Sequence, residues 1–285
     1  MDDKRTYPKW TGEIMALFLA GSAHFLTGRR MAGLAWHFGT LAALQFGVLV
    51  AVMAGDATGG LAILPFLAAL ALWCVMLTQS YRPVPRIGAL GWVVVIVAGV
   101  GLNRFWAWNF SNLAQTYRIS SASMAPTIVD GDWIFVEKLS LMFGDPERGE
   151  IVVFRTDGIP TPTPGTEFVM RIAGLPGDRI RIHPPNLIVN GQVLTTPPVF
   201  KKIASSEPPF NGFQLVSPGI PGGAVLSRPT DEIVLGPDEY FVLGDNTPRS
   251  RDSRCWGPLP RQNITGRVKA IFWPPSRADQ PVNKE

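Results

Sequence analysis

Residues 87–108 read IGALGWVVVIVAGVGLNRFWAW. This stretch is uncharged as far as Arg104, and it separates two halves of different composition. Residues 31–103 contain only three charged side chains, whereas 22 of the 26 prolines follow residue 104. A soluble chain usually has about a quarter of its residues charged, so the first half is strongly depleted. The division argues against a single uniform globular domain and against a pure multi-span transporter.

The charge-poor half is predicted to lie in a membrane. A hydrocarbon core of about 30 Å requires roughly 20 apolar residues in a helix. Three uncharged stretches meet or approach that length: Met31–Gly55, Gly59–Tyr81 and Ile87–Asn103. The third is short, but the Arg104 side chain can extend to the polar interface. We therefore expect residues 31–104 to form three transmembrane helices.

The N-terminal segment, residues 1–30, is predicted to be cytoplasmic or interfacial. Its apolar stretch Ile14–Leu26 is about half a membrane thick, which favours an interfacial or re-entrant segment over a span. Basic residues near membrane segments favour the cytoplasmic side. Here they flank the apolar stretch on both sides, as Lys4, Arg5, Lys9, Arg29 and Arg30.

This charge distribution also predicts the orientation of the rest of the chain. If the first segment does not cross, the loop 55–58 lies outside and the loop with Arg82 and Arg86 lies inside. Everything after Arg104 is then extracytoplasmic. The expected location is the plasma (inner) membrane, with several spans.

Residues 105–285 are predicted to form a β-rich extracytoplasmic domain. Short runs of β-branched and aromatic residues, separated by proline and glycine, indicate strands. Asn190-Gly191 between two apolar runs predicts a hairpin with a type I′ turn. Residues 195–235 are rich in proline, glycine and serine and are expected to be a loop-rich insertion. The strands are expected at Trp133–Glu137, Glu150–Arg155, Phe168–Ala173, Arg179–Ile182, Glu239–Leu243 and Arg267–Trp273.

Several function classes are not supported by the residues. The net charge of +4 comes with no basic run longer than two residues, whereas nucleic-acid binding needs a clustered basic face. Cys74 and Cys255 lie in different halves, and no His/Cys cluster has the spacing of a metal site. We expect no cofactor, no metal and no nucleic-acid partner. The lipid bilayer is an expected partner, and the oligomeric state is not indicated.

Four blocks follow the apolar half in a fixed order. They are ISSASMAPTI at 119–128, GEIVVF at 149–154, RIAGLPGD at 171–178, and GDN at 244–246 with SRDSR at 250–254. Together they resemble the type I signal peptidases, the membrane-bound serine proteases of family S26, over residues of about 118–275. The resemblance implies a mainly β domain of the signal-peptidase type. It also implies a serine endopeptidase that removes signal peptides from exported preproteins.

The resemblance further implies roles for individual residues. Ser123 corresponds to the nucleophile. The Ser121 hydroxyl and the Ser123 backbone N–H correspond to the oxyanion hole, whose donors are each worth about 10²–10³ in rate. Five further residues correspond to two supporting ion pairs and to the serine that positions the family's lysine: Arg171 with Asp245, Asp252 with Arg254, and Ser250.

The chain departs from the family pattern at the general base. That base is a lysine immediately before the arginine of the third block, and here the position is Met170. A thioether cannot take the proton of Ser123, and the Arg171 guanidinium stays protonated. A serine hydroxyl is a poor nucleophile without an activating base.

Three explanations of this departure stay open. The base could be another residue, could be one that the sequence does not identify, or could be missing. In the last case the chain would be a slow or non-catalytic homologue that binds preproteins or acts as a membrane scaffold. The leading prediction is the peptidase, acting on an extended segment with small residues at −3 and −1 that pairs with a strand edge. The candidates for a replacement base are Lys138, Lys201, Lys202, Lys269 and His183.

Overall fold

The computed structural model describes residues 6–54, 64–81, 83–161, 163–217, 223–278, 280 and 282. The predicted loop 55–58 and the basic residues Lys4, Arg5 and Arg82 lie outside these residues. The chain forms two compact units, residues 1–111 and 112–285. Each unit is described by itself.

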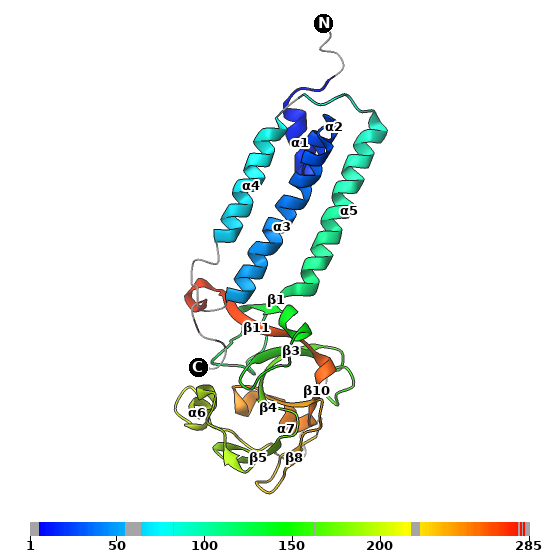
Figure 1. The fold of residues 1–285 in the computed structure, drawn as a ribbon. Coiled ribbons are helices and arrows are strands. Elements are labelled where there is room, and N and C mark those ends of the chain that lie inside the picture. The colour runs from blue at the N-terminus through cyan, green and yellow to red at the C-terminus, as the bar shows by residue number, and fades with distance from the viewer. Residues whose placement is uncertain are drawn as a thin grey trace. The chain divides into compact units, whose positions relative to one another are not determined.

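The first unit is helical (Figure 1). Its elements are α1 (Trp10–Phe18), α2 (Ser22–Leu26), α3 (Arg30–Ala54), α4 (Leu64–Ser80) and α5 (Ala89–Leu113), the last of which continues into the next unit. The apolar stretch 14–26 is broken into α1 and α2 at Gly21, which has a φ of 79°. A Cβ at Gly21 would lie 2.0 Å from the Gly33 carbonyl oxygen of α3, so this close approach of two helices requires glycine.

The helices α3, α4 and α5 fall where the three transmembrane helices were predicted. One boundary differs: α5 continues past the predicted end at Asn103 to Leu113. Residues 59–63 of the second predicted span lie outside the described residues. Within the part of the chain that the structure describes, no helix is both long enough and apolar enough to cross a bilayer. The three membrane spans therefore remain a prediction.

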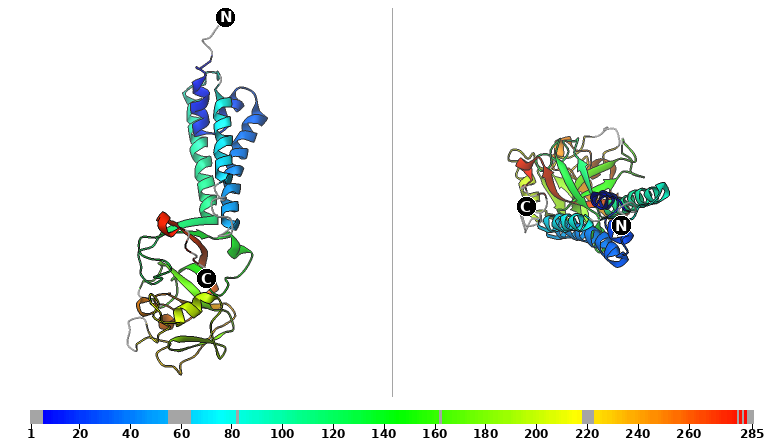
Figure 2. Two further views of the ribbon diagram at one scale, coloured as in Figure 1. Left: turned by 90° about the vertical axis from the view of Figure 1, so that its left-hand side faces the viewer. Right: turned by 90° about the horizontal axis from the view of Figure 1, so that it is seen from above.

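The second unit is mainly β, as predicted. All its strand pairs are antiparallel and form two sheets, visible from two further sides in Figure 2. The larger has the order β1-β2-β11-β3-β4-β9-β10 and the smaller the order β7-β6-β5-β8. The strands of the larger sheet are β1 (Ala114–Arg118), β2 (Trp133–Glu137), β3 (Ile151–Arg155), β4 (Glu167–Gly174), β9 (Glu239–Leu243), β10 (Leu259–Pro260) and β11 (Ile264–Trp273).

The smaller sheet contains the predicted hairpin. Its strands are β5 (Arg179–His183), β6 (Asn186–Val189), β7 (Gln192–Val193) and β8 (Ile233–Val234). The turn between β6 and β7 has positive φ angles at Asn190 (52°) and Gly191 (81°). These are the angles that a type I′ turn requires and that Asn-Gly accepts, so the hairpin prediction is confirmed.

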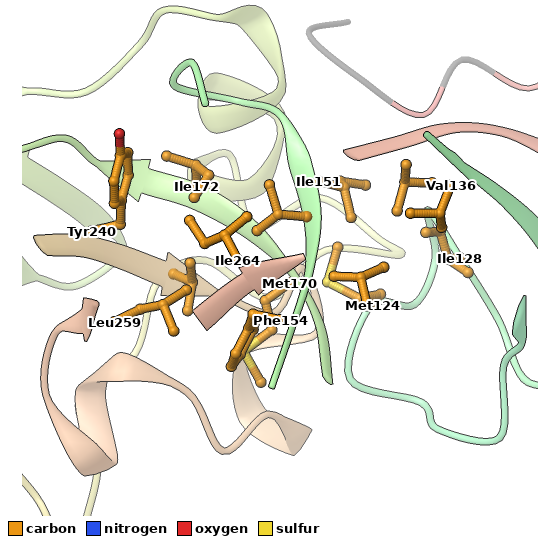
Figure 3. Close-up of a cluster of buried hydrophobic side chains, with 14 of the residues drawn as sticks. Met124, Ile128, Val136, Ile151, Phe154, Met170, Ile172, Tyr240, Leu259 and Ile264 are labelled. Carbon is orange, nitrogen blue, oxygen red and sulfur yellow. The ribbon is translucent and has the colours of Figure 1, made fainter. Parts of the chain in front are cut away.

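Two apolar cores hold this unit together. One lies on the larger sheet and includes Met124, Phe154 and Met170, which Figure 3 shows in one cluster. The other lies between the smaller sheet and α6 (Pro198–Ala204), which buries Val199, Phe200 and Ile203. Full burial of such side chains contributes about 1.5–3 kcal/mol each.

Short elements complete the unit. They are α7 (Ser253–Trp256) and the 3₁₀ helices η3 (Leu139–Met142), η4 (Thr247–Arg249), η5 (Arg261–Asn263) and η6 (Pro275–Arg277). Residues 195–235 were predicted to be a loop-rich insertion, and this prediction did not include the helix α6. The apolar side chains of α6 complete the second core. The strand β1 was not anticipated either.

We expect the Phe154→Ala substitution to lower the free energy of unfolding by about 3–5 kcal/mol, because it leaves a cavity in a close-packed core. Phe154 is fully buried, with its ring centroid 6.0 Å from those of Phe168 and Trp256. Phe143→Ala serves as the matched control: Phe143 is 83% exposed, so its loss should change stability by about 0.5 kcal/mol or less. Urea unfolding followed by near-UV circular dichroism measures both. Equal effects would contradict the core assignment.

Candidate active site

Ser123 lies in the wall of a cavity of about 430 Å³ in the second unit. Four segments that are distant in sequence supply the lining: β1 with the turn after it, β3, the first half of β4, and residues near 250. Part of the lining is apolar and part is charged. The lining residues are Tyr117, Arg118, Ile119, Ser120, Ser121, Ser123, Met124, Val153, Glu167, Phe168, Val169, Met170, Arg249 and Arg251.

The two serines predicted as nucleophile and oxyanion-hole residue contact each other. The Ser123 backbone N–H donates to the Ser121 Oγ at 3.2 Å, and the Ser121 hydroxyl donates to the Ser123 Oγ, also at 3.2 Å. Ser123 is half-buried and Ser121 is exposed. Both predicted oxyanion donors are therefore engaged within this pair. A substrate oxygen could accept hydrogen bonds from these two donors only after the contacts between the two serines are broken.

The turn that carries Ser123 is held from behind by the block 244–246. The Asn246 backbone N–H donates to the Ser123 carbonyl oxygen at 2.9 Å, and the Asn246 side-chain amide donates to the Ala122 carbonyl oxygen at 2.9 Å. Two segments more than a hundred residues apart are thereby fixed to each other. The position of the Ser123 hydroxyl follows from this backbone contact.

The first predicted ion pair is present and buried. Arg171 donates from Nε to Asp245 Oδ1 at 2.8 Å and from a terminal nitrogen to Oδ2 at 2.7 Å. Its other terminal nitrogen donates to the Gly149 carbonyl oxygen at 2.7 Å, and the Thr127 hydroxyl donates to Asp245 Oδ2 at 2.5 Å. Because Thr127 follows Ser123 closely and Arg171 follows Met170, the pair joins β4 to the serine turn.

The second predicted ion pair is also present and buried. Arg254 contacts Asp252 through Nε at 2.7 Å and through a terminal nitrogen at 2.8 Å. Arg254 also donates to the carbonyl oxygens of Thr247 and Gln214, at 2.7 and 2.8 Å, and Asp252 accepts from the Gly244 N–H at 3.1 Å. This pair therefore fixes the course of the chain from Gly244 to Ser250.

Ser250 lies beside the Ser123 backbone with its hydroxyl unsatisfied. A Cβ at Gly244 would lie 2.3 Å from the Ser250 Oγ and 2.5 Å from the Ser123 carbonyl oxygen, so only glycine fits between them. Ser250 is 8% exposed, and its Oγ has no hydrogen-bond partner among the described residues. Buried hydroxyls are normally hydrogen-bonded. The Ser250 hydroxyl is thus an exception to this rule among the described residues.

Met170 fills the position of that lysine with an apolar side chain. It lies on β4 opposite Val152 of β3, is 3% exposed and lines the cavity with Ser123. Its side chain belongs to the same apolar cluster as Met124, as Figure 3 shows. The site contains no proton acceptor at this position.

The five candidate replacement bases lie elsewhere. Lys138 donates to Gln115 at 2.8 Å, and Lys269 lies 3.5 Å from the Glu137 carboxylate. Lys201 and Lys202 are exposed on α6, and His183 is exposed at the end of β5. Within the described part of the chain, none of the five lines the Ser123 cavity.

Sequence reasoning missed the charged part of the lining. The Tyr117 hydroxyl donates to Glu167 Oε1 at 3.0 Å, and burial together with this carboxylate raises the pKa of Tyr117 well above its usual range. Arg118, Arg249 and Arg251 add three guanidinium groups. A signal was available for two of these arginines, since Arg249 and Arg251 flank Ser250 directly. Tyr117 and Arg118 lie on β1, the strand that was not anticipated.

The fold and this cavity define a mainly β protein with a serine-centred site, and comparisons with known proteins agree. The family described as signal peptidase, peptidase S26, matches residues 89–273. The chain is 34% identical over 186 residues to the probable signal peptidase I-2 of Synechocystis sp., covering 65% of this chain and 72% of that protein. It is also 34% identical over 179 residues to thylakoidal processing peptidase 1 of Arabidopsis thaliana. This match covers 60% of this chain and 46% of that protein.

A crystal structure of a signal peptidase I from Enterococcus faecalis is also similar, with 27% identity and a TM-score of 0.32 over 44% of this chain and 97% of that one. The chain belongs to the signal peptidase family, peptidase S26. The members of that family to which it is similar are named signal peptidase I or processing peptidase, which makes it one of a family of peptide-bond hydrolases.

We expect Asp245→Ala to lower the free energy of unfolding by about 3–5 kcal/mol, because it leaves the Arg171 charge buried and unpaired. The matched control is Asp157→Ala, which removes the carboxylate of an exposed pair with Arg155 and should cost about 0–1 kcal/mol. Urea unfolding of the full chain compares the two. A cost for Asp245→Ala no larger than that of the control would show that the buried pair does not hold the site.

Proposed function

We propose that this chain is a membrane-bound serine endopeptidase that removes signal peptides from exported preproteins, with Ser123 as its nucleophile. The observation that carries the proposal is the position of Ser123 in a cavity bordered by two strands with unoccupied edges. No cofactor or metal takes part in the proposed reaction. The supporting residues are Ser121, Arg171, Asp245, Ser250, Asp252 and Arg254.

The strand edges support binding of an extended peptide. Among the described residues, β1 pairs only with β2. The strand β4 pairs with β9 from Arg171 onward, so Glu167–Met170 have no strand partner on that side. An incoming peptide can add to such edges through its main chain and place alternate side chains in pockets. The apolar lining around Met124 and Met170 suits small apolar side chains at −1 and −3.

The chemistry proposed for Ser123 follows from its neighbours. Attack of the Ser123 Oγ on the peptide carbonyl places negative charge on the carbonyl oxygen. The Ser123 N–H and the Ser121 hydroxyl would turn from each other toward that oxygen and stabilise it. The Ser123 proton must leave in the same step, and because Met170 cannot accept it, the proton would have to pass to solvent water. We therefore expect slow cleavage compared with a site that has a lysine at this position.

A second candidate function is supported by the same residues. Met170 in place of the base and the unsatisfied Ser250 hydroxyl fit a non-catalytic member of the family that binds preproteins or acts as a membrane scaffold. Binding needs the cavity and the strand edges but not the base. The two candidates therefore differ in cleavage and agree in peptide recognition.

A cleavage assay with the purified full chain in lipid distinguishes them. With a preprotein substrate, we expect slow cleavage by the wild type, none by Ser123→Ala, and cleavage about 10²–10⁴-fold faster by Met170→Lys, the range that general-base catalysis contributes. Met142→Lys is the control, since Met142 is 74% exposed and does not line the cavity.

If the wild type leaves the preprotein uncut while Met170→Lys cuts it, the second candidate replaces the first. If Ser123→Ala cuts as well as the wild type, Ser123 is not the nucleophile. Failure of every variant to cut, together with failure to bind the preprotein, would reject both candidates.

The membrane arrangement is part of the proposal. We propose a cytoplasmic or interfacial segment at 1–30, three spans within 31–104, and a peptidase domain at 105–285 on the extracytoplasmic side of the plasma (inner) membrane. The long uncharged stretches and the basic residues near the N-terminus support it. The exposed apolar side chains of Met142 and Phe143 suit an interfacial contact.

Protease digestion tests this orientation. In intact spheroplasts we expect externally added protease to degrade the domain at 105–285 and to leave an epitope tag at the N-terminus intact, because the tag lies in the cytoplasm. Lysed spheroplasts, in which both should be degraded, are the control. Protection of the domain until lysis would contradict the predicted orientation.

A further inference from the structure

The arginines of the second unit fall into two groups. Most pair with carboxylates, as Arg171 does with Asp245 and Arg254 with Asp252. Within the described residues, the arginines of this unit that form no ion pair are Arg118, Arg181, Arg249 and Arg251. All of these except Arg181 line the Ser123 cavity. Three of these four unpaired arginines are therefore gathered at the candidate active site.

The three cavity arginines come from separate segments. Arg118 ends β1, Arg249 ends η4, and Arg251 follows Ser250; all three are exposed. One carboxylate, that of Glu167, also lines the cavity, and it accepts a hydrogen bond from the Tyr117 hydroxyl. The charged part of the lining thus consists of three guanidinium groups and one carboxylate.

This arrangement has a chemical consequence for any bound peptide. A guanidinium remains protonated at all relevant pH values and pairs with a carboxylate through parallel hydrogen bonds. A concave surface with one sign of charge also concentrates ligands of the opposite sign. Arg249 and Arg251 flank Ser250, which lies across Gly244 from the Ser123 carbonyl oxygen. The charge is therefore close to the bond that Ser123 would attack.

We propose that the cavity selects peptides with an acidic side chain within about three residues of the bond presented to Ser123. A strand advances about 3.3 Å per residue, so a cavity of about 430 Å³ reaches a few residues around that bond. The apolar lining takes the small side chains, and the guanidinium groups take the carboxylate. This selection rests on the proposed function, because it concerns peptides held at Ser123.

Peptide binding without cleavage tests the selection. The full chain with Ser123→Ala is placed in discs of zwitterionic lipid. Three fluorescent peptides of equal length have alanine at −3 and −1 and differ only in carrying Asp, Asn or Lys at flanking positions. At low salt, the Asp peptide should bind about two- to fivefold more tightly per acidic residue than the Asn peptide, and the Lys peptide most weakly. Salt at about 0.5 M should remove most of the difference, since it screens exposed charges.

Substitutions of the arginines provide the matched controls. Changing Arg118, Arg249 and Arg251 together to Gln should bring the affinity for the Asp peptide down to that for the Asn peptide and so abolish the preference. Arg181 also has no ion pair among the described residues, donates to the Pro229 carbonyl oxygen at 3.3 Å and does not line the cavity, so Arg181→Gln should leave the preference intact. Circular dichroism verifies that each variant is folded.

The possible results separate this inference from the proposed function. Equal binding of the Asp and Asn peptides by the parent protein overturns the acidic selection but leaves the peptidase proposal standing. An equal loss of the preference for Asp in Arg181→Gln also overturns the acidic selection, because the preference would then depend on the total charge of the protein and not on the cavity. Vesicles of anionic phospholipid that bind through the three arginines, with no discrimination among peptides, would assign these groups to lipid instead. If no peptide binds, both proposals fail.

Discussion

The candidate site depends on the buried ion pair between Arg171 and Asp245. Removing two charges from water costs several kcal/mol per ion, and a buried pair is tolerated when the remaining donors and acceptors are also satisfied. Here the guanidinium also reaches the carbonyl oxygens of Gly149 and Val282, and the carboxylate accepts from Thr127. The pair thereby fixes β4, the end of β9 and the segment after Ser123 relative to one another. Breaking it would remove the side-chain connection between these strands and the segment after Ser123.

The methionine at position 170 leaves this framework intact. None of the hydrogen bonds that hold the Ser123 turn involves the Met170 side chain; they come from Asn246, Thr127 and the two ion pairs. Methionine has nearly the length of lysine but no charge to satisfy, so it packs with Met124 in the apolar core. In the proposed function, peptide recognition and proton transfer therefore depend on different parts of the site.

Sequence reasoning succeeded where the determining interactions are local. Short runs of β-branched and aromatic residues placed β2, β5 and β9 to within a residue, and Asn190-Gly191 placed the hairpin. It failed at β1, whose short run AQTYR has no strong strand pattern and is held by pairing with β2. It also failed at α6, whose apolar face is defined by packing in the second core. The motif blocks predicted the ion pairs, but the gathering of Arg118, Arg249 and Arg251 depends on tertiary structure and could not be found along the chain.

The cationic lining also bears on the chemistry at position 170. A general base must be unprotonated to accept the Ser123 proton, and a lysine meets this requirement only when its pKa is lowered. Burial lowers the pKa of an amine, and so do neighbouring positive charges. Position 170 is buried, and it shares its cavity with three guanidinium groups against one carboxylate, that of Glu167, which acts in the opposite direction. The surroundings of Met170 would thus favour the neutral form of a lysine nitrogen, and the departure from the family chemistry is concentrated in that one missing atom.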